Sequence, residues 1–162
     1  MLREVNMPGQ YPLFLNYQIP VACNGFWAGI TMKGRVLLDE SEGECWVFGV
    51  NPGGISASAD NRESALSAYK TRLTEVVHDL AEVSKDFVEF KLEMEESFQV
   101  NPEYLNMWNE ALKIVREGKS DLAGMTREPA ETEASIRIDQ IERPNPAMNS
   151  SEKITLARSK AA

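Results

Sequence analysis

The chain has 162 residues, of which 25 are acidic and 17 basic, so its formal net charge is -8. Hydrophobic residues make up 43% and charged residues 26%, an ordinary balance that argues against a wholly disordered chain. No apolar run approaches the roughly 18–20 residues of a membrane-spanning helix, and no basic block is present to hold a phosphate backbone. We therefore expect neither a membrane span nor direct DNA binding.

Residues with catalytic or metal-binding chemistry are few. Cys23 and Cys45 are too few for a disulfide framework or a four-ligand zinc site, and we expect free thiols in a reducing cytoplasm. His78 is the only histidine, and no serine lies in a nucleophile-elbow motif. We therefore expect no enzyme, no metal and no cofactor. Dispersed Asp and Glu residues that meet only in the folded chain remain as an enzymatic alternative.

The first part of the chain combines prolines with short apolar runs. Pro12 and Pro20 interrupt residues 1–25, which predicts an extended, irregular lead-in. The apolar runs at 26–38 and 45–50 flank a short polar segment that contains a glycine, which predicts a β-hairpin.

A third strand and a helix are predicted next. Asn51-Pro52-Gly53-Gly54 breaks the second strand, and residues 55–58 are expected to form a third, short strand. Asp60 and Glu63 have the spacing of a capping box, which predicts that a helix begins at Asp60.

The strongest periodicity of the sequence follows this cap. Nine apolar residues recur at alternating spacings of three and four, as on one face of a helix: Leu66, Tyr69, Leu73, Val76, Leu80, Val83, Phe87, Phe90 and Met94. This heptad seam predicts a helix over residues 60–98. A break near Ser84 stays open, because an unbroken helix of that length would measure about 57 Å.

The remaining segments are shorter or more polar. Asn101-Pro102-Glu103 predicts the start of a second helix, and Gly118 its end. Residues 119–142 are expected to be a polar linker, in which 136–139 alternate like a short strand. Residues 143–162 are expected to be a flexible tail.

These elements predict an α+β domain over residues 26–118. We expect a small antiparallel sheet of about three strands packed on one long helix and followed by a helical extension.

Part of this pattern matches a known family. Arg35-Val36-Leu37-Leu38 and Trp46-Val47-Phe48-Gly49-Val50 flank a polar turn, and Pro52-Gly53 precedes small residues and Asp60, with Glu63 and Ala65 just inside the helix. In these features residues 33–83, about a third of the chain, resemble the N-terminal domain of the HicB antitoxin family. A wider run, from Gly25 to Gly54 and around Trp108, looks like a bacterial group of HicB-like proteins of unassigned function.

The resemblance implies both a fold and a function. It implies a partial RNase-H-like sheet without nuclease carboxylates, in a protein that binds and blocks a small basic ribonuclease toxin. Family members usually carry a DNA-binding domain as well, but residues 119–162 show no such helices and no basic recognition face. The resemblance therefore implies toxin binding more than autorepression.

Two classes of function follow from these observations. The first is a non-enzymatic HicB-like protein-binding module that meets a basic partner through a sheet edge or an acidic helix. The alternative is a structural or assembly protein, a homo-oligomer in which two chains dimerise through the heptad seam at 66–94. The candidate contact residues are two aromatic anchors on the sheet and three helical carboxylates: Trp46, Phe48, Glu89, Glu93 and Glu96.

Overall fold

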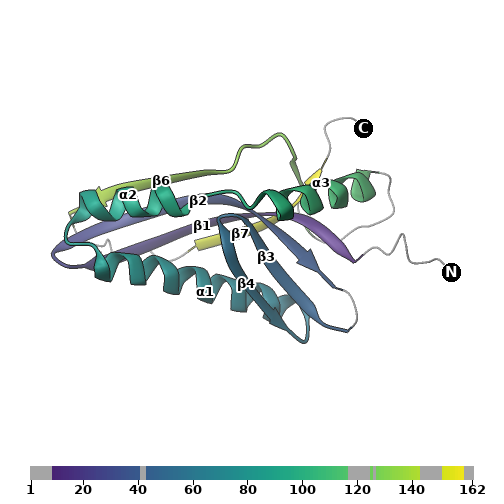
Figure 1. Cartoon of the computed structure of the whole chain (residues 1–162), viewed down its shortest axis with the longest axis horizontal. Coiled ribbons are helices and arrows are strands. Elements are labelled where there is room, and N and C mark those ends of the chain that lie inside the picture. The colour runs from purple at the N-terminus through teal and green to yellow at the C-terminus, as the bar shows by residue number, and fades with distance from the viewer. Residues whose placement is uncertain (1–8, 41–42, 117–124, 126, 143–150, 159–162) are drawn as a thin grey trace.

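The computed structural model describes residues 9–40, 43–116, 125, 127–142 and 151–158. Within these ranges the chain forms a seven-stranded mixed sheet and three helices (Figure 1). The strand order is β4-β3-β2-β1-β7-β5. β6 lies outside this order and pairs with residues 27–33 of β2, next to the part of β2 that pairs with β3. The elements are β1 (Gln10–Cys23), β2 (Phe26–Asp39), β3 (Cys45–Asn51), β4 (Gly53–Ala59), α1 (Arg62–Val83), α2 (Phe87–Ser97), α3 (Pro102–Arg116), β5 (Arg127–Pro129), β6 (Ser135–Ile141) and β7 (Ser151–Arg158).

This architecture corrects the predicted fold class. The class α+β holds, but the prediction of a small sheet of about three strands on one long helix is wrong. The predicted strands at 26–38, 45–50 and 55–58 are present as β2, β3 and β4, and they are joined by four further strands. Of those four, β6 corresponds to the short strand predicted at 136–139, whereas β1, β5 and β7 come from segments whose prolines or polar residues hid their strand pattern.

β1 occupies the segment where prolines predicted an irregular lead-in, and that prediction is wrong for residues 10–23. β1 pairs with β2 along its whole length and with β7 over residues 13–18. Pro12 and Pro20 both lie outside residues 13–18, so each has a partner strand on one edge only, where proline is tolerated. Asn24 and Gly25, both with positive φ, then form the tight turn into β2.

The C-terminal third of the chain also contributes to the sheet. The strand expected at 136–139 is present as β6, which pairs with residues 27–33 of β2. β7 lies between β1 and β5, where the prediction of a flexible tail is wrong for residues 151–158. Its Leu156 and Ala157 are fully buried. The other parts of the expected tail and the first part of the expected linker lie outside the described residues.

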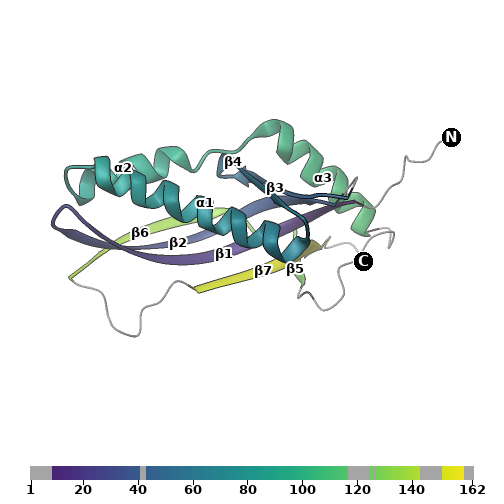
Figure 2. The ribbon, with the colours of Figure 1, turned by 90° about the horizontal axis from the view of Figure 1, so that it is seen from below.

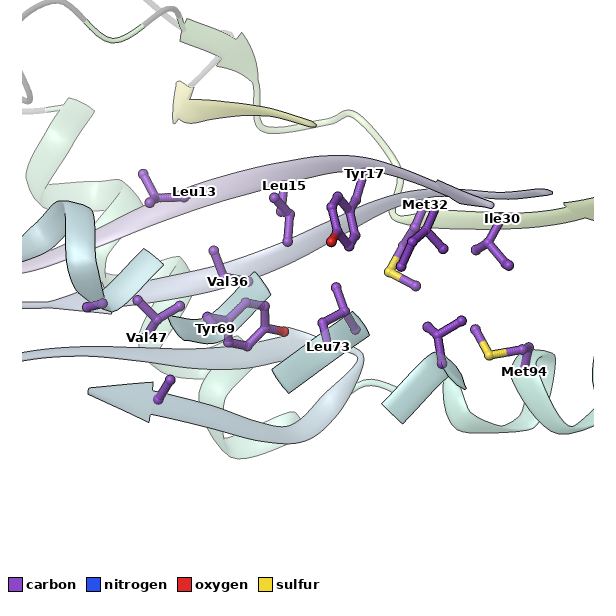
Figure 3. Close-up of a cluster of buried hydrophobic side chains, with 14 of the residues drawn as sticks. Leu13, Leu15, Tyr17, Ile30, Met32, Val36, Val47, Tyr69, Leu73 and Met94 are labelled. Atoms are coloured by element: carbon purple, nitrogen blue, oxygen red, sulfur yellow. The ribbon is translucent and has the colours of Figure 1, made fainter. Parts of the chain in front are cut away.

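The first face of the sheet carries the larger core. Side chains at alternate positions of β1 and β2 point to this face, where they pack against α1 and α2 (Figures 2 and 3). Leu13, Leu15 and Tyr17 come from β1, Met32 and Val36 from β2, and all are buried. This strict period of two is what a half-buried strand requires.

The second face carries a smaller core under α3. Phe14, Leu37 and Val50 point to this face and pack around Trp108 and Ala111 of α3. The link between α2 and α3 reaches this face past the β3–β4 turn. There the Asn101 amide donates to the Val50 carbonyl, and the Gly53 amide donates to the Gln99 carbonyl.

The long helix predicted over residues 60–98 is two helices. The break left open near Ser84 is present: α1 ends at Val83, and α2 starts after Asp86, whose side chain accepts a hydrogen bond from the Glu89 amide. The start of α1 also differs from prediction, because its cap is Asn61 and not Asp60. The Asn61 side chain accepts from the Ser64 amide at 2.8 Å.

The helix break changes the meaning of the heptad seam. The buried stripe of α1 runs through Ala65, Tyr69, Leu73, Val77 and Ala81, whereas seam residue Val83 is 75% exposed. The seam residues Tyr69, Leu73, Phe90 and Met94 are buried in the core of their own chain. They are therefore not available to a second helix.

No helix in the described part of the chain is long and apolar enough to cross a membrane.

Candidate partner-binding site

The two predicted aromatic anchors lie on the second face of the sheet, in β3. Trp46 stacks on Phe48 with ring centroids 5.6 Å apart, and Phe48 stacks on Tyr104 of α3 at 4.9 Å. Phe48 is half-buried as a result, and Trp46 forms the outer end of the stack with 37% of its surface exposed. Of the pair, Trp46 is therefore the side chain that a partner can reach.

The three predicted carboxylates lie together on α2. Glu89, Glu93 and Glu96 are spaced four and three residues apart, so they share one side of that helix. Glu93 and Glu96 are exposed, whereas Glu89 is half-buried and its Oε1 accepts a hydrogen bond from the Lys85 amide at 2.7 Å. Glu89 therefore stabilises the start of the helix, and Glu93 and Glu96 supply the accessible negative charge.

The structure does not bring these two groups into one patch. The carboxylates belong to a helix that packs on the first face, and the aromatic stack belongs to the second face. The strand that carries the aromatic stack, β3, pairs with β4.

β4 is an edge strand of the sheet. Within the described residues β4 pairs with β3 alone, and Gly54, Ser56 and Ser58 are exposed. Ser58 lies beside Trp46 in the pairing of β3 with β4, so the aromatic stack borders this edge on the second face.

The other edge strands are protected in the way natural sheets usually are. β6 carries Arg137 and Asp139, which form an ion pair at 2.8 Å, and β5 carries Arg127, Glu128 and Pro129. Charged residues and proline on an edge oppose pairing with another chain. The β4 sequence Gly-Gly-Ile-Ser-Ala-Ser-Ala contains neither, so β4 is the edge on which another strand can pair without burying a charge.

Charged groups elsewhere on the second face hold strands together. Lys33 forms an ion pair with Glu128, and the Thr155 hydroxyl donates to Glu128 at 2.8 Å. Burial opposes ionisation of Glu128, but the hydrogen bonds from Lys33 and Thr155 outweigh it and lower its pKa. Burial lowers the pKa of Arg35, whose guanidinium lies 5.4 Å from the centre of the Trp108 ring. These pairs join β2, β5, β7 and α3.

The remaining reactive side chains are scattered. Cys45 is buried beside Glu40, and burial together with that carboxylate raises the pKa of its thiol. Glu40 in turn binds Arg62 through two hydrogen bonds, of 2.7 and 2.8 Å. His78 is exposed on α1. Among the residues that the structure describes, no group of three or more His, Cys, Asp or Glu side chains is placed to hold a metal ion.

Sequence reasoning identified the residues beside the β4 edge but did not single out the edge itself. The third strand was expected at 55–58, yet which strand lies at an edge depends on the pairing of all seven. One signal was available, since a strand made of glycine, serine and alanine with one isoleucine has little to pack on both faces.

Comparisons of this chain with models of protein families, with curated proteins and with solved structures find no match.

Proposed function

We propose that this chain is a non-enzymatic protein-binding module that acts on a small basic protein in the cytoplasm. In the HicB-like form of this proposal, the chain is an antitoxin-type inhibitor and its partner is a small ribonuclease. The observation that carries the proposal is the edge of β4, which in the described part of the chain pairs with β3 alone and carries no charged residue or proline.

Main-chain pairing at such an edge is a common way to recognise a protein. An extended segment of the partner adds as a further strand, and its amides and carbonyls take the hydrogen bonds that the edge leaves open. Ser56 and Ser58 are small enough to let another backbone approach, and Trp46 beside them offers apolar surface on the second face.

The charge of the chain favours a basic partner. A net charge of -8 attracts cationic proteins over distances of about a Debye length and raises their association rate. Glu93 and Glu96 place part of this charge on the surface of α2. The β4 edge carries no charged residue. The residues that attract a basic partner are therefore different from the strand that pairs with it.

The test is capture of the partner from the native cells with the tagged chain, followed by mass spectrometry, sizing and a ribonuclease assay. We expect a small basic protein at fixed stoichiometry, whose ribonuclease activity falls when the chain is added. Capture of no protein by the wild-type chain would overturn the proposal.

Two variants separate edge pairing from general attraction between charges. Ser58→Lys and Ser58→Glu both place a charge on the edge, but only the lysine repels a basic partner. We expect both to lower capture, because a charged residue on an edge strand opposes pairing with another chain. If Ser58→Glu binds as well as wild type and Ser58→Lys does not, the contact is electrostatic and does not depend on strand pairing at β4, which would overturn the edge-pairing mechanism.

A further inference from the structure

An apolar cavity of about 210 Å³ opens beside the first residues of β4. It lies where β4 meets α1 and α2, and its walls include Met32, Ile55, Leu73, Val76 and Met94. Figure 3 shows Met32, Leu73 and Met94 approaching this region from three different elements.

We propose that this cavity receives one apolar side chain, of leucine or methionine size, from an extended partner segment that pairs with β4. The inference rests on the proposed function. It specifies the partner segment as a strand with one apolar anchor and with basic neighbours on the same face.

The position of the cavity fits an added strand. Gly53, Gly54 and Ile55 of β4 line the cavity. The Gly53 amide already donates to the Gln99 carbonyl, so an added strand would pair with β4 from Gly54 onwards and would pass beside the cavity there. Alternate side chains of that strand would point to the first face, towards α1 and the cavity. Gly54 has φ +87 and no other atom within 4 Å of the place where a Cβ would stand, so no other part of the described chain covers this residue on that side.

The size and lining of the cavity fit an apolar side chain. A cavity of about 150 Å³ lined by aliphatic and aromatic side chains stays dry and binds benzene, so this larger one has room for a branched aliphatic group. Met32 and Met94 are flexible and polarizable, and they can adjust to the shape of the group that enters.

Charge on α2, the helix that forms one wall of the cavity, determines what should flank the anchor. Glu93 and Glu96 directly precede Met94 and Ser97, two residues that line the cavity. Both carboxylates are exposed. Lysine or arginine on the same face of the added strand would meet them, whereas acidic neighbours would be repelled.

Synthetic peptides test this directly on the full chain. The probe is a fluorescein-labelled peptide, Thr-Lys-Val-Leu-Val-Lys-Thr-amide, in which leucine and both lysines share one face of a strand. Two control peptides accompany it. One has alanine in place of leucine, and the other is the leucine peptide N-methylated at alternate residues. Binding is followed by fluorescence anisotropy, and the location of the site by amide NMR shifts.

We expect the leucine peptide to bind about 10- to 100-fold more tightly than the alanine peptide, as burial of three more carbon atoms implies. N-methylation on the edge-facing amides should abolish binding, and the NMR shifts should include β4. Equal binding of the leucine and alanine peptides, or shifts confined to α3, would overturn the inference.

Two variants that fill the cavity and one matched control complete the test. Val76→Phe from α1 and Ser97→Phe from α2 should remove the preference for leucine over alanine. Val83→Phe, on the exposed end of the same helix as Val76, should leave it unchanged. Circular dichroism identifies a variant that fails to fold, and the other variant then decides. A preference that survives in the folded variants overturns the inference.

The outcome is separable from that of the proposed function. If no peptide binds while the chain still captures a basic protein from cells, the cavity is not the anchor site and the protein-binding function stands. If capture also fails, both are overturned.

Discussion

Tyr69 gives the sharpest test of the core, because removing its hydroxyl should stabilise the protein. Tyr69 is 1% exposed, and within the described structure its Oη has no hydrogen-bond partner. It faces Gly49, where a Cβ would come within 2.7 Å of the same oxygen. A buried hydroxyl without a partner costs about 1–3 kcal/mol, so we expect Tyr69→Phe to raise the free energy of unfolding by about 1 kcal/mol.

The matched control has the opposite sign. Tyr17 is also buried, but its hydroxyl is hydrogen-bonded to the Thr74 hydroxyl. Tyr17→Phe should therefore lower the free energy of unfolding by about 0.5–1.5 kcal/mol. Both are measured by urea unfolding with circular dichroism, as shifts of the midpoint at unchanged slope.

The pH dependence supplies an independent check. Burial raises the pKa of Tyr69 above its ordinary value. Above a pH of about 10 the unfolded chain releases this proton while the folded chain keeps it, so the folded state loses stability as pH rises, by up to about 1.4 kcal/mol per unit. Tyr69→Phe removes that loss, and its advantage over wild type should grow above pH ~10.

If Tyr69→Phe destabilises the protein as much as Tyr17→Phe does, the Tyr69 hydroxyl is paired in solution. If wild type and Tyr69→Phe lose stability in parallel above a pH of about 10, the hydroxyl is not shielded from water and its pKa is not raised.

Three further predictions concern the frame around the site. Trp108→Ala should cost about 3–5 kcal/mol of unfolding free energy, because the ring is 2% exposed. Trp46→Ala, at a position 37% exposed, should cost under ~1 kcal/mol. Equal losses in urea unfolding would mean that α3 does not cover the second face. Gly49→Ala would place a Cβ 2.3 Å from the Pro52 carbonyl oxygen, so thermal melting should show a loss of about 1–3 kcal/mol or more, and a neutral result would refute this close packing of the β3–β4 turn. Asn61→Ala should cost about 1 kcal/mol by urea unfolding, and no change would argue that this residue is not the cap of α1.

Local signals in the sequence identified most of the central elements. The strands at 26–38 and 45–50 are β2 and β3, and two apolar runs on either side of a short polar segment were sufficient to predict them. The cap at Asn101 is also observed, since its side chain accepts from the Tyr104 amide at 3.0 Å. These features depend on neighbours within a few residues, which the sequence states directly.

β1 was missed although its pattern is in the sequence. Tyr11, Leu13, Leu15, Tyr17 and Ile19 occupy alternate positions and are all buried. The interpretation of the segment relied on its prolines, which oppose a strand that is paired on both edges. Whether a strand is paired on one edge or on two at a given residue is decided by distant segments, here β7.

The candidate site shows the same division. The exposed Trp46 and the acidic stretch of α2 were identified as residues, and both are accessible. Their placement on opposite faces was not predictable, because it depends on where α2 and α3 pack. The heptad seam was misleading for the same reason: its period is that of a helix, but the sheet determines which side of each helix is buried.

The sequence by itself determined the composition, the net charge of -8, the periodicity of each segment and the absence of charge from residues 53–59. Those properties belong to single residues and near neighbours. Only the tertiary structure decided that residues 53–59 form an edge, that an apolar cavity opens beside them, and that β7 closes the other side of β1. An edge and a cavity are defined by what does not pack against them, and that depends on the arrangement of the whole sheet.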